Sequence, residues 1–470
     1  MTSDNVHPPP KTLDQWLAHI ERVHPQSIAM GLERVAAVKQ ALGLSPEFVV
    51  ITVGGTNGKG SACAMLEAIL HHAGYKVGCY TSPHLVRYNE RVRIARREAS
   101  DADLVRAFEA VERARAVARR NAEQGPRLRG YDRADAQTTD TDTPGSPESV
   151  SEAVALTYFE FGTLAAAWLF AEARVDVAIL EVGLGGRLDA VNAFDADCAL
   201  VMSVELDHMD YLGPTRESIG YEKAGIFRAG RPAICADPDP PQTLRRHAEA
   251  LGARLLVRGT DFGYATQRVQ WRYDGPHGRR HCLPHPVLRG AHQLANASAC
   301  LAALDTLRDR LPVTMDDIRT GLLEAETPGR FQVLPGRPVV ILDVAHNPAA
   351  AQALAATLAQ MGRAGRTIAV FAMLSDKDIG GVIDALESHI DCWFIAPIAA
   401  PRGADTALLG ETLRGRAVRG TVRTCASIAE AYAQACDMAV QNDKILAFGS
   451  FYTVGAVMEA RARPHPPGTA

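Results

Sequence analysis

A glycine-rich segment, GGTNGKGS from Gly54 to Ser61, has the residues needed to bind the phosphates of a nucleotide. Glycines let backbone N–H groups turn inward around a phosphate, and the positive end of a following helix adds to the attraction. Lys59 can reach the distal phosphates, and the Ser61 hydroxyl can bind Mg²⁺. The strict G-x-x-x-x-G-K-[ST] pattern is broken because Gly60 separates Lys59 from Ser61. We predict a phosphate loop here, with a simple glycine-rich turn as the alternative.

Three further polar residues follow strand-like segments, at the point where each segment ends. Ser82 follows KVGCYT, Glu181 lies near the end of VDVAILEV, and His208 follows DCALVMSV. Ligands of open α/β sheets bind beyond the carboxyl ends of the strands. Ser82 and Glu181 offer the oxygen ligands that Mg²⁺ prefers, whereas histidine is a less usual ligand for it. Each residue could equally be a satisfied structural polar group.

The second half of the chain contains a similar candidate segment. DVAHNP, from Asp343 to Pro348, follows the apolar run PVVIL and precedes a helix-like segment, which places Asp343 and His346 on a strand-to-helix loop. A capped helix entry with proline in the first turn is the alternative interpretation. Lys223 in EKAGI is, by its type alone, a solvated lysine on a helix surface.

Strand-like apolar runs alternate with helix-like periodic segments along most of the chain. FVVITV (48–53) is a buried strand by its pattern, and the residues after the phosphate loop recur at helical spacing. Further strands are expected at 76–81, 175–182, 197–204, 338–343, 366–374, 392–398 and 444–450. This alternation predicts an α/β fold with mainly parallel sheets.

Two breaks in this pattern suggest the domain organisation. Residues 121–152 have almost no large apolar side chains, which predicts a flexible insertion. A second break lies at Thr327-Pro328-Gly329, after which a fresh α/β alternation begins. We therefore expect one domain at 1–327 and a smaller one at 328–470, in keeping with a length of 470 residues.

Bulk composition excludes several classes of protein. The formal net charge is −4, with no long basic block, so the sequence predicts neither a nucleic-acid partner nor an anionic membrane surface. The nine cysteines form no C-x-x-C pair, which is typical of free thiols in a reducing compartment. No apolar run approaches the length of a membrane span. We expect a cytoplasmic protein.

The motifs, taken together and in order, resemble the folylpolyglutamate synthase family, whose architecture is shared with the Mur ligases. The resemblance runs from about residue 17 to about residue 459 and looks most like the bacterial bifunctional form, which acts as dihydrofolate synthase and folylpolyglutamate synthase. It is carried by GLERV, GTNGKGS, TSPHLVRYNERVRI, LTYFEFGT, LEVGLGGRLDA, LDHMDYLG, EKAGIFR, PGRF, DVAHNP, DKD (376–378) and GSFYTV.

The resemblance implies a P-loop-type ATPase domain followed by a smaller Rossmann-like domain that ligates glutamate. It implies ATP and Mg²⁺ as cofactors and leaves open an added monovalent cation. The phosphates would be held by Asn57, Gly58, Lys59, Gly60 and Ser61. Other ATP contacts would come from Asn296, Arg330 and Asp343, and the magnesium ligands would be Ser61, Ser82, Glu181 and His208. Lys59, Lys223 and His346 are the catalytic candidates, and Lys223 matches a lysine that is carbamylated in the family.

The acceptor substrate would bind at two further segments. These are the loop residues Ser27, Ile28, Ala29 and Met30, and the helix residues Tyr158, Phe159 and Thr163. Ala29-Met30 stands where an acidic residue is expected before Gly-Leu-Glu-Arg, which favours polyglutamylation over the use of dihydropteroate. Val191 and Tyr452 also replace an expected threonine and histidine.

The implied reaction is the ATP-dependent formation of an amide between a pteroate or folate carboxylate and L-glutamate, through an acyl phosphate. The expected partners are dihydropteroate or a reduced folate, L-glutamate and ATP, bound by a monomer. Polyglutamylation alone is one alternative, supported by Ala29. A nucleotide-binding regulator without ligase chemistry is another, but it predicts damaged metal ligands. A cell-wall Mur ligase would share the chemistry without TSPHL and LTYFEFGT in this form.

Overall fold

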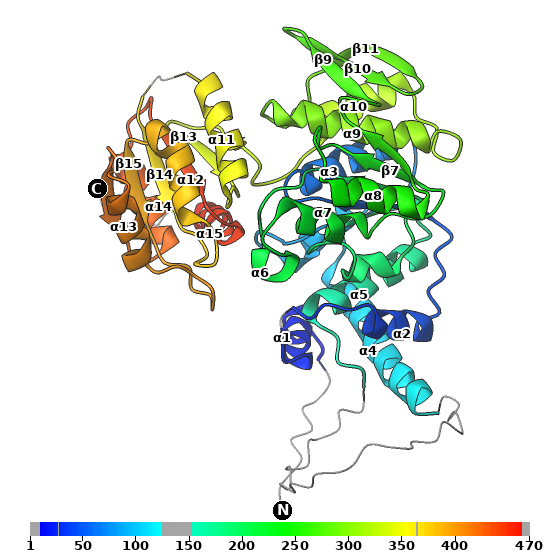
Figure 1. Ribbon diagram of the computed structural model, residues 1–470. Coiled ribbons are helices and arrows are strands. Elements are labelled where there is room, and N and C mark those ends of the chain that lie inside the picture. Colours follow the sequence, from blue (N-terminus) through cyan, green and yellow to red (C-terminus); the bar gives the residue numbers. More distant parts are fainter. Residues whose placement is uncertain (1–9, 27, 125–152, 363–364, 463–470) are drawn as a thin grey trace, which may run out of the picture. The chain divides into compact units, whose positions relative to one another are not determined.

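The structure, a computed structural model, describes residues 10–26, 28–124, 153–362 and 365–462 (Figure 1). These residues divide into two compact units. The helical unit takes in the described residues of Met1–Glu47 and Ser100–Ala173, and the main unit takes in those of Phe48–Ala99 and Arg174–Ala470. The chain therefore passes between the units more than once. The sequence predicted two consecutive domains, 1–327 and 328–470, and did not predict this interleaving.

Aromatic side chains form the centre of the helical unit. Trp16 of α1 lies with its ring centroid 6.1 Å from that of Phe108 on α4 and 6.5 Å from that of Phe161 on α5. Thr12 and Gln15 form a capping box that starts α1, and Thr157 and Glu160 form one that starts α5. The helices are α1 (Leu13–Val23), α2 (Glu33–Ala41), α4 (Asp101–Gln124) and α5 (Tyr158–Glu172).

The predicted insertion at 121–152 begins too early. Helix α4 continues to Gln124, so the first four residues of that segment are helical. The remainder of the insertion, 125–152, lies outside the described residues.

The main unit contains an eight-stranded sheet in the order β4-β3-β2-β5-β1-β6-β7-β8. Strands β2, β5, β1, β6, β7 and β8 are parallel, and β3 and β4 pair antiparallel at one edge. Their bounds are β1 (Val49–Gly54), β2 (Val77–Tyr80), β3 (Val92–Ile94), β4 (Arg97–Glu98), β5 (Val177–Glu181), β6 (Cys198–Val201), β7 (Pro232–Cys235) and β8 (Arg254–Val257).

The register of this sheet places the predicted functional loops at one edge. Val53 of β1 pairs with Glu181 of β5 and with Leu200 of β6. The phosphate loop after β1, the carboxylate at the end of β5 and the loop after β6 therefore leave the sheet side by side. The strands expected at 48–53, 76–81, 175–182 and 197–204 are confirmed.

Apolar helices and a small antiparallel sheet complete this core. Alternate residues of β1 and β5 pack against the apolar faces of α3, α9 and α10. The helices are α3 (Lys59–His72), α6 (Met209–Leu212), α7 (Arg216–Ala224), α8 (Gln242–Leu251), α9 (His292–Thr306) and α10 (Met315–Glu324), with short 3-10 turns η1 (Tyr88–Arg91) and η2 (Ala190–Ala193). The small sheet consists of β9 (Gly263–Thr266), β10 (Gln270–Gly275) and β11 (Gly278–Pro284).

A second, six-stranded sheet follows in the order β12-β13-β17-β14-β15-β16. Only β12 runs antiparallel to its neighbour. The strands are β12 (Gln332–Leu334), β13 (Val339–Asp343), β14 (Thr367–Phe371), β15 (Cys392–Ile395), β16 (Thr421–Thr424) and β17 (Lys444–Phe448). The helices are α11 (Pro348–Gln360), α12 (Ile379–Leu386), α13 (Thr406–Gly415), α14 (Ile428–Met438) and α15 (Phe451–Ala462), with the 3-10 turn η3 (Glu387–His389).

Both faces of the second sheet are apolar and covered by helices. One core cluster packs against α11, α12 and α13, and the other packs against α14 and α15. This doubly covered parallel sheet matches the continuous apolar runs from which four of its strands were predicted. The predicted α/β class with mainly parallel sheets is confirmed. In the part of the chain that is described, no helix is long and apolar enough to cross a lipid bilayer.

Removing the Phe371 ring should weaken the second sheet. The ring is fully buried, with centroids 5.4 Å from Trp393 and 4.9 Å from Phe448. Phe371→Ala should lower the free energy of unfolding by about 3–5 kcal/mol, measured by urea titration with tryptophan fluorescence. The control Val422→Ala, at an exposed site on β16, should change it by less than about 0.5 kcal/mol. An unchanged midpoint for Phe371→Ala would contradict the described packing.

Candidate active site

The phosphate loop is shaped by glycines where no larger residue fits. Gly55 has φ 133°, and a Cβ there would lie 2.9 Å from the Met202 nitrogen. Gly58 has φ 88°, and a Cβ there would lie 2.7 Å from Oδ1 of Asn296. Helix α3 starts at Lys59, so its first backbone N–H groups, which lack partners within the helix, face the loop's end. The loop therefore has the backbone of an anion site.

Lys59 is bonded to the loop that carries it. Its Nζ donates to the carbonyl oxygens of Gly55, at 3.0 Å, and Thr56, at 3.2 Å. The ammonium group is thus held over the loop, where the distal phosphates of a nucleotide would lie.

A buried carboxylate stands next to this loop. Glu181 Oε2 accepts a hydrogen bond from the Ser82 backbone N–H at 2.9 Å. Burial raises the pKa of Glu181, and the charges of Lys59 and Arg330 and the Ser82 hydrogen bond oppose that shift only in part. A buried carboxylate of this kind is stabilised by an added cation.

The oxygen donors around Glu181 suit Mg²⁺. The hydroxyl of Ser61 is buried and lies 3.3 Å from Nε2 of Gln293, which donates to it. Hydroxyl and carboxylate oxygens are the ligands Mg²⁺ prefers, and water and phosphate oxygens usually complete its shell. Among the residues that are described, no group of three or more His, Cys, Asp and Glu side chains is placed to hold a metal ion by itself. The arrangement therefore fits an ion that arrives with phosphates.

Lys223 on α7 is buried rather than solvated, which corrects the expectation from its residue type alone. Burial, with the charge of Lys59 acting in the same direction, lowers the pKa of Lys223 to about 7. Burial likewise raises the pKa of Asp189 to about 7, although the backbone N–H groups of Leu184 and Val191 donate to its carboxylate. A large fraction of the Lys223 amine is therefore neutral near pH 7.

Arg330 has a buried N–H group with no partner among the described residues. Its Nη1 atom makes no hydrogen bond, and the guanidinium carbon lies 5.0 Å from the ring centroid of Phe451. Burial lowers the pKa of Arg330, and the nearby charges of Asp343 and Glu181 raise it. An unsatisfied buried donor is costly, so this group is poised to bond a ligand oxygen.

Asp343 ends strand β13 and holds its loop. Its carboxylate accepts from the backbone N–H groups of Phe331 and Ala345, each at 2.8 Å. Burial raises the pKa of Asp343, against the opposing charge of Arg330. The loop that Asp343 holds carries His346, whose Nδ1 lies 2.9 Å from the Val344 carbonyl oxygen.

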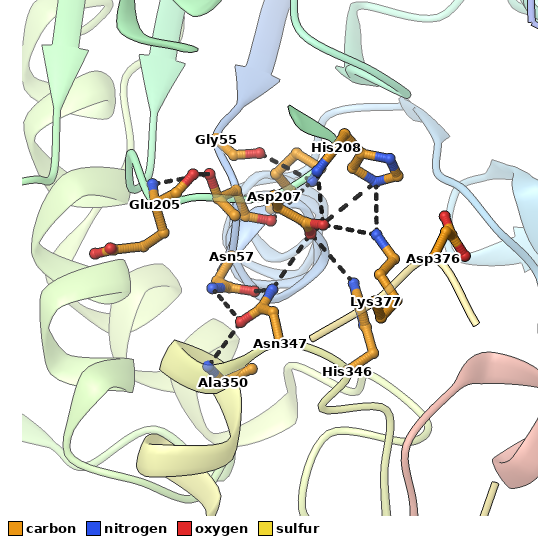
Figure 2. A network of polar contacts seen from close by, with 12 residues as sticks. Gly55, Asn57, Glu205, Asp207, His208, His346, Asn347, Ala350, Asp376 and Lys377 are labelled. Atoms are coloured by element: carbon orange, nitrogen blue, oxygen red, sulfur yellow. Dashed lines mark hydrogen bonds and ion pairs between the residues drawn. The ribbon is translucent and has the colours of Figure 1, made fainter. Parts of the chain in front are cut away.

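Asp207 is the centre of a polar network that joins loops of the two sheets (Figure 2). Lys377 Nζ lies 2.6 Å from Asp207 Oδ1, and the two side chains are only 7% and 9% exposed. Asn347 Nδ2 donates to Asp207 Oδ2 at 3.4 Å, and His346 Nε2 lies 3.5 Å from the same oxygen. Burial opposes ionisation, but these neighbours hold the pKa of Asp207 far below its ordinary range.

The same network reaches the phosphate loop. Asn57 and Asn347 exchange side-chain hydrogen bonds of 3.3 and 3.2 Å. His208 follows Asp207, and its Nε2 lies 3.4 Å from Lys377 Nζ (Figure 2). Burial lowers the pKa of His208 to about 4, so the ring is neutral and accepts from the lysine. In this arrangement His208 is bonded to Lys377 rather than to a group near Glu181.

One cavity of about 700 Å³ gathers nearly all of these groups. It is lined by every residue predicted to contact nucleotide or metal and by Lys223 and His346, namely Asn57, Gly58, Lys59, Gly60, Ser61, Ser82, Glu181, His208, Lys223, Asn296, Arg330, Asp343 and His346. Asp207, Lys377 and Gln293 also line it and were not predicted as site residues. Two features of the sequence could have pointed to them: Asp207 adjoins the predicted ligand His208, and Lys377 lies within the DKD motif.

The residues predicted to bind the acceptor belong to the helical unit. Ile28, Ala29 and Met30 lie in the loop before α2, and Ser27 lies outside the described residues. Tyr158 and Phe159 are partly exposed in the first turn of α5. Thr163 is buried, and its hydroxyl donates to the Phe159 carbonyl at 2.9 Å. The hydroxyl of Thr163 is thus satisfied inside the helix, so a substrate contact by it stays a prediction without geometric support.

Comparison with known proteins identifies the family. The chain matches the Mur ligase middle domain over residues 138–304 and the Mur ligase glutamate ligase domain over residues 329–451. It is 43% identical over 448 residues to the dihydrofolate synthase/folylpolyglutamate synthase of Escherichia coli, covering 95% of each chain. This chain belongs to the bifunctional dihydrofolate synthase/folylpolyglutamate synthase family of Mur ligases. The counterpart in Haemophilus influenzae is 37% identical, covering 94% of this chain and 96% of its own.

Solved structures of this family have the same fold. The Escherichia coli enzyme FolC in complex with DHPP and ADP superposes with a TM-score of 0.84 at 42% identity, covering 96% of this chain and 98% of that one. A family member from Yersinia pestis, complexed with AMPPNP and Mn, superposes with a TM-score of 0.82 at 42% identity, covering 96% and 98%. Nucleotide and a divalent metal are thus bound by relatives of this chain.

Replacing Lys223 should change how stability depends on pH. Because the pKa of Lys223 is lowered, the unfolded chain binds its proton between about pH 7 and pH 10 while the folded protein does not, so stability rises with pH. Lys223→Met should therefore be more stable than the parent by about 4 kcal/mol at pH 7 and by about 1 kcal/mol at pH 9.5. Urea unfolding in bicarbonate-free buffer measures this. A difference that stays constant with pH would contradict the burial of a neutral amine.

The Asp207–Lys377 pair should show strong energetic coupling. A double-mutant cycle with Asp207→Asn and Lys377→Met should give a coupling free energy of roughly 2–3 kcal/mol, because both side chains are withdrawn from water. The more exposed pair Arg402–Asp376, on neighbouring loops, is the matched control and should give less than about 1 kcal/mol. Equal coupling free energies in the two cycles would show that burial of the Asp207–Lys377 pair adds little to the stability of the folded protein.

Proposed function

We propose that this chain uses ATP to join the carboxylate of dihydropteroate, and then of reduced folates, to the amine of L-glutamate. As a member of its family, the chain is an ATP-dependent acid–amino-acid ligase. The observation that carries the proposal is the convergence of the phosphate loop, the buried Glu181 carboxylate and the Arg330 guanidinium, whose Nη1 is buried, on one cavity.

The nucleotide would bind along the phosphate loop. Asn57, Gly58, Lys59, Gly60 and Ser61 would hold the phosphates, and Asn296, Arg330 and Asp343 would make further contacts. The unpartnered Nη1 of Arg330 supports this assignment because it needs an acceptor. Asn296 approaches Gly58 closely enough to define one wall of the loop.

Magnesium would be held by Ser61, Ser82, Glu181 and His208. The first three offer oxygen atoms beside the phosphate loop, whereas His208 would have to exchange its contact with Lys377 for the metal. When bound with ATP, Mg²⁺ supplies charge neutralisation at the phosphate oxygens. A monovalent cation alongside Mg²⁺ stays a prediction from the resemblance.

The reaction needs an activated carboxylate because amide formation from a free carboxylate is uphill in water. An oxygen of the acceptor carboxylate attacks the γ-phosphorus of ATP, and the bond to the leaving ADP breaks. The glutamate amine then attacks the resulting acyl phosphate at carbon, the bond to the phosphate oxygen breaks, and inorganic phosphate leaves. Lys59 and Arg330 would stabilise the charge on the phosphoryl group during transfer.

His346 and Lys223 are the other proposed catalytic residues. The Val344 carbonyl can only accept a hydrogen bond, so Nδ1 of His346 donates to it. Because Nε2 lies 3.5 Å from Asp207 Oδ2, His346 would have to leave this carboxylate before Nε2 could take a proton from the attacking amine. Lys223 would carry a carbamate, formed when its neutral amine attacks CO₂ and loses a proton. Its pKa of about 7 favours the neutral form that this reaction requires.

The acceptor would contact the loop 27–30 and the first turn of α5. Tyr158 and Phe159 are partly exposed there and offer aromatic surface for a ring system. Polyglutamylation alone is the second candidate function, and Ala29 is the observation that favours it. Conversely, the intact set of phosphate-loop residues and oxygen donors argues against a regulator without chemistry.

The proposal also covers the extent of the glutamate-ligating domain, the oligomeric state and the cellular location. The glutamate-ligating domain would comprise residues 328–470, which is supported by a second sheet that begins at Gln332. The protein would act as a monomer, because the nucleotide and metal groups come from one chain. A cytoplasmic location stays a prediction from the sequence.

Phosphate release tests the proposed function. Purified protein with ATP, Mg²⁺ and L-glutamate should release phosphate with dihydropteroate and with tetrahydrofolate, and each product should gain the mass of one glutamyl unit. Turnover with tetrahydrofolate alone would support the second candidate function. No phosphate release with either acceptor would overturn the ligase assignment.

Replacing Lys59 tests its role at the phosphates. Lys59→Met should lower kcat by about 10²–10³, since a charged group at the phosphates is lost. The control Lys11→Met, at an exposed lysine of the helical unit, should leave kcat unchanged.

A further inference from the structure

Arg34, in the first turn of α2, connects two separate segments of the helical unit. Its Nη2 donates to the Ala29 carbonyl oxygen at 2.8 Å and to Glu160 Oε1 at 2.6 Å. Its Nε lies 3.3 Å from Glu160 Oε2, so the pairing with the carboxylate is two-pronged. One guanidinium group therefore joins the loop before α2 to the first turn of α5.

Glu160 is fixed independently of Arg34. It is the third residue of α5, and its Oε2 accepts from the Thr157 N–H at 2.7 Å while the Thr157 hydroxyl accepts from the Glu160 N–H at 3.3 Å. The side chain of Glu160 is 4% exposed and that of Arg34 is 27% exposed. The carboxylate is thus a buried, rigid anchor, and a planar guanidinium that engages both of its oxygens has little freedom to rotate.

The hydrogen bond from Arg34 to the Ala29 carbonyl is not needed to neutralise Glu160, because two other bonds already join Arg34 to that carboxylate. It goes to a main-chain carbonyl in the loop 28–30, which is irregular and has no helix or strand bonds of its own. A hydrogen bond from a charged group is worth about 1.5–3 kcal/mol when its partner would otherwise be loose. The bond therefore restricts where this loop lies relative to Tyr158 and Phe159.

We propose that Arg34 is a positioning residue for acceptor binding, which holds the loop 28–30 against the first turn of α5. This inference rests on the proposed function, because it takes these two segments as the acceptor site. Because Arg34 donates to the main-chain carbonyl of Ala29, the position of the loop does not depend on the side chain at residue 29. The alanine found there in place of an acidic residue is then compatible with a formed acceptor site.

Steady-state kinetics of Arg34→Gln tests the inference. The KM for dihydropteroate and for tetrahydrofolate should rise roughly tenfold, as expected for the loss of one charge-assisted hydrogen bond. The KM values for ATP and glutamate and the kcat at saturating acceptor should stay within about twofold. A purely structural role would instead lower the melting temperature and the active fraction without selecting one substrate.

Two conservative variants separate positioning from folding. Arg34→Lys keeps a cation that can reach only one of the two partners well, so the acceptor KM should recover to within about threefold of the parent. Glu160→Gln keeps an N3 side chain able to complete the capping box of α5 but removes the charge that orients Arg34, so it should raise the acceptor KM in the same direction. The matched control is Arg113→Gln on α4, an exposed arginine that pairs with Glu109 at 4.0 Å and should alter no constant.

The outcomes distinguish this inference from the proposed function. A parent protein that turns over neither acceptor overturns the proposed function itself. An active parent whose acceptor KM is unmoved in Arg34→Gln and Glu160→Gln overturns the positioning role of Arg34. If Arg34→Gln does not fold, the soluble Arg34→Lys and Glu160→Gln variants decide: a selective rise in acceptor KM supports the role, and unchanged constants refute it.

Discussion

The parallel alignment of β5, β1 and β6 is the constraint on which the candidate active site depends. Hydrogen bonding between these strands sets Val53 beside Glu181 and Leu200, so each strand ends at the same edge. The glycine loop, the buried carboxylate and the loop with Asp207 and His208 all follow from that register. A shift of one residue in β1 would turn its side chains to the opposite faces and separate the loop from Glu181.

Burial then determines the chemistry of the groups that the sheet collects. Glu181, Asp189, Lys223 and Arg330 all have pKa values moved toward the neutral form because they are withdrawn from water. Asp207 is the exception, since a lysine and two histidines surround it. The cavity therefore contains ionisable groups that a bound ligand or metal would stabilise in their charged form, such as Glu181 and Arg330. It also contains the Asp207 carboxylate, whose charge is already neutralised by neighbouring side chains. That division is what a site for a polyanionic nucleotide and its metal requires.

Much of this could be predicted from the sequence because the informative signals are local. A strand, a glycine turn and a helix occur within twenty residues around Lys59, and strand ends mark Ser82, Glu181, His208 and Asp343. Contacts between distant segments could not be predicted in this way. Lys377 and Asp207 are 170 residues apart, and nothing in either neighbourhood specifies the other. The interleaved helical unit was missed for the same reason, because composition gives no sign that the described residues of 1–47 pack with those of 100–173.

The hydrogen bonds that Lys59 makes to Gly55 and Thr56 bear on how tightly a nucleotide can be held. A free lysine side chain loses up to about 2 kcal/mol of rotamer entropy when it is immobilised. In this protein most of that loss has already occurred before any ligand arrives, because the ammonium group is confined over the loop. Binding then exchanges the two carbonyl contacts of Lys59 for phosphate contacts. The loop is in this sense preorganised, and its affinity reflects the strength of the new bonds more than the entropy of forming the site.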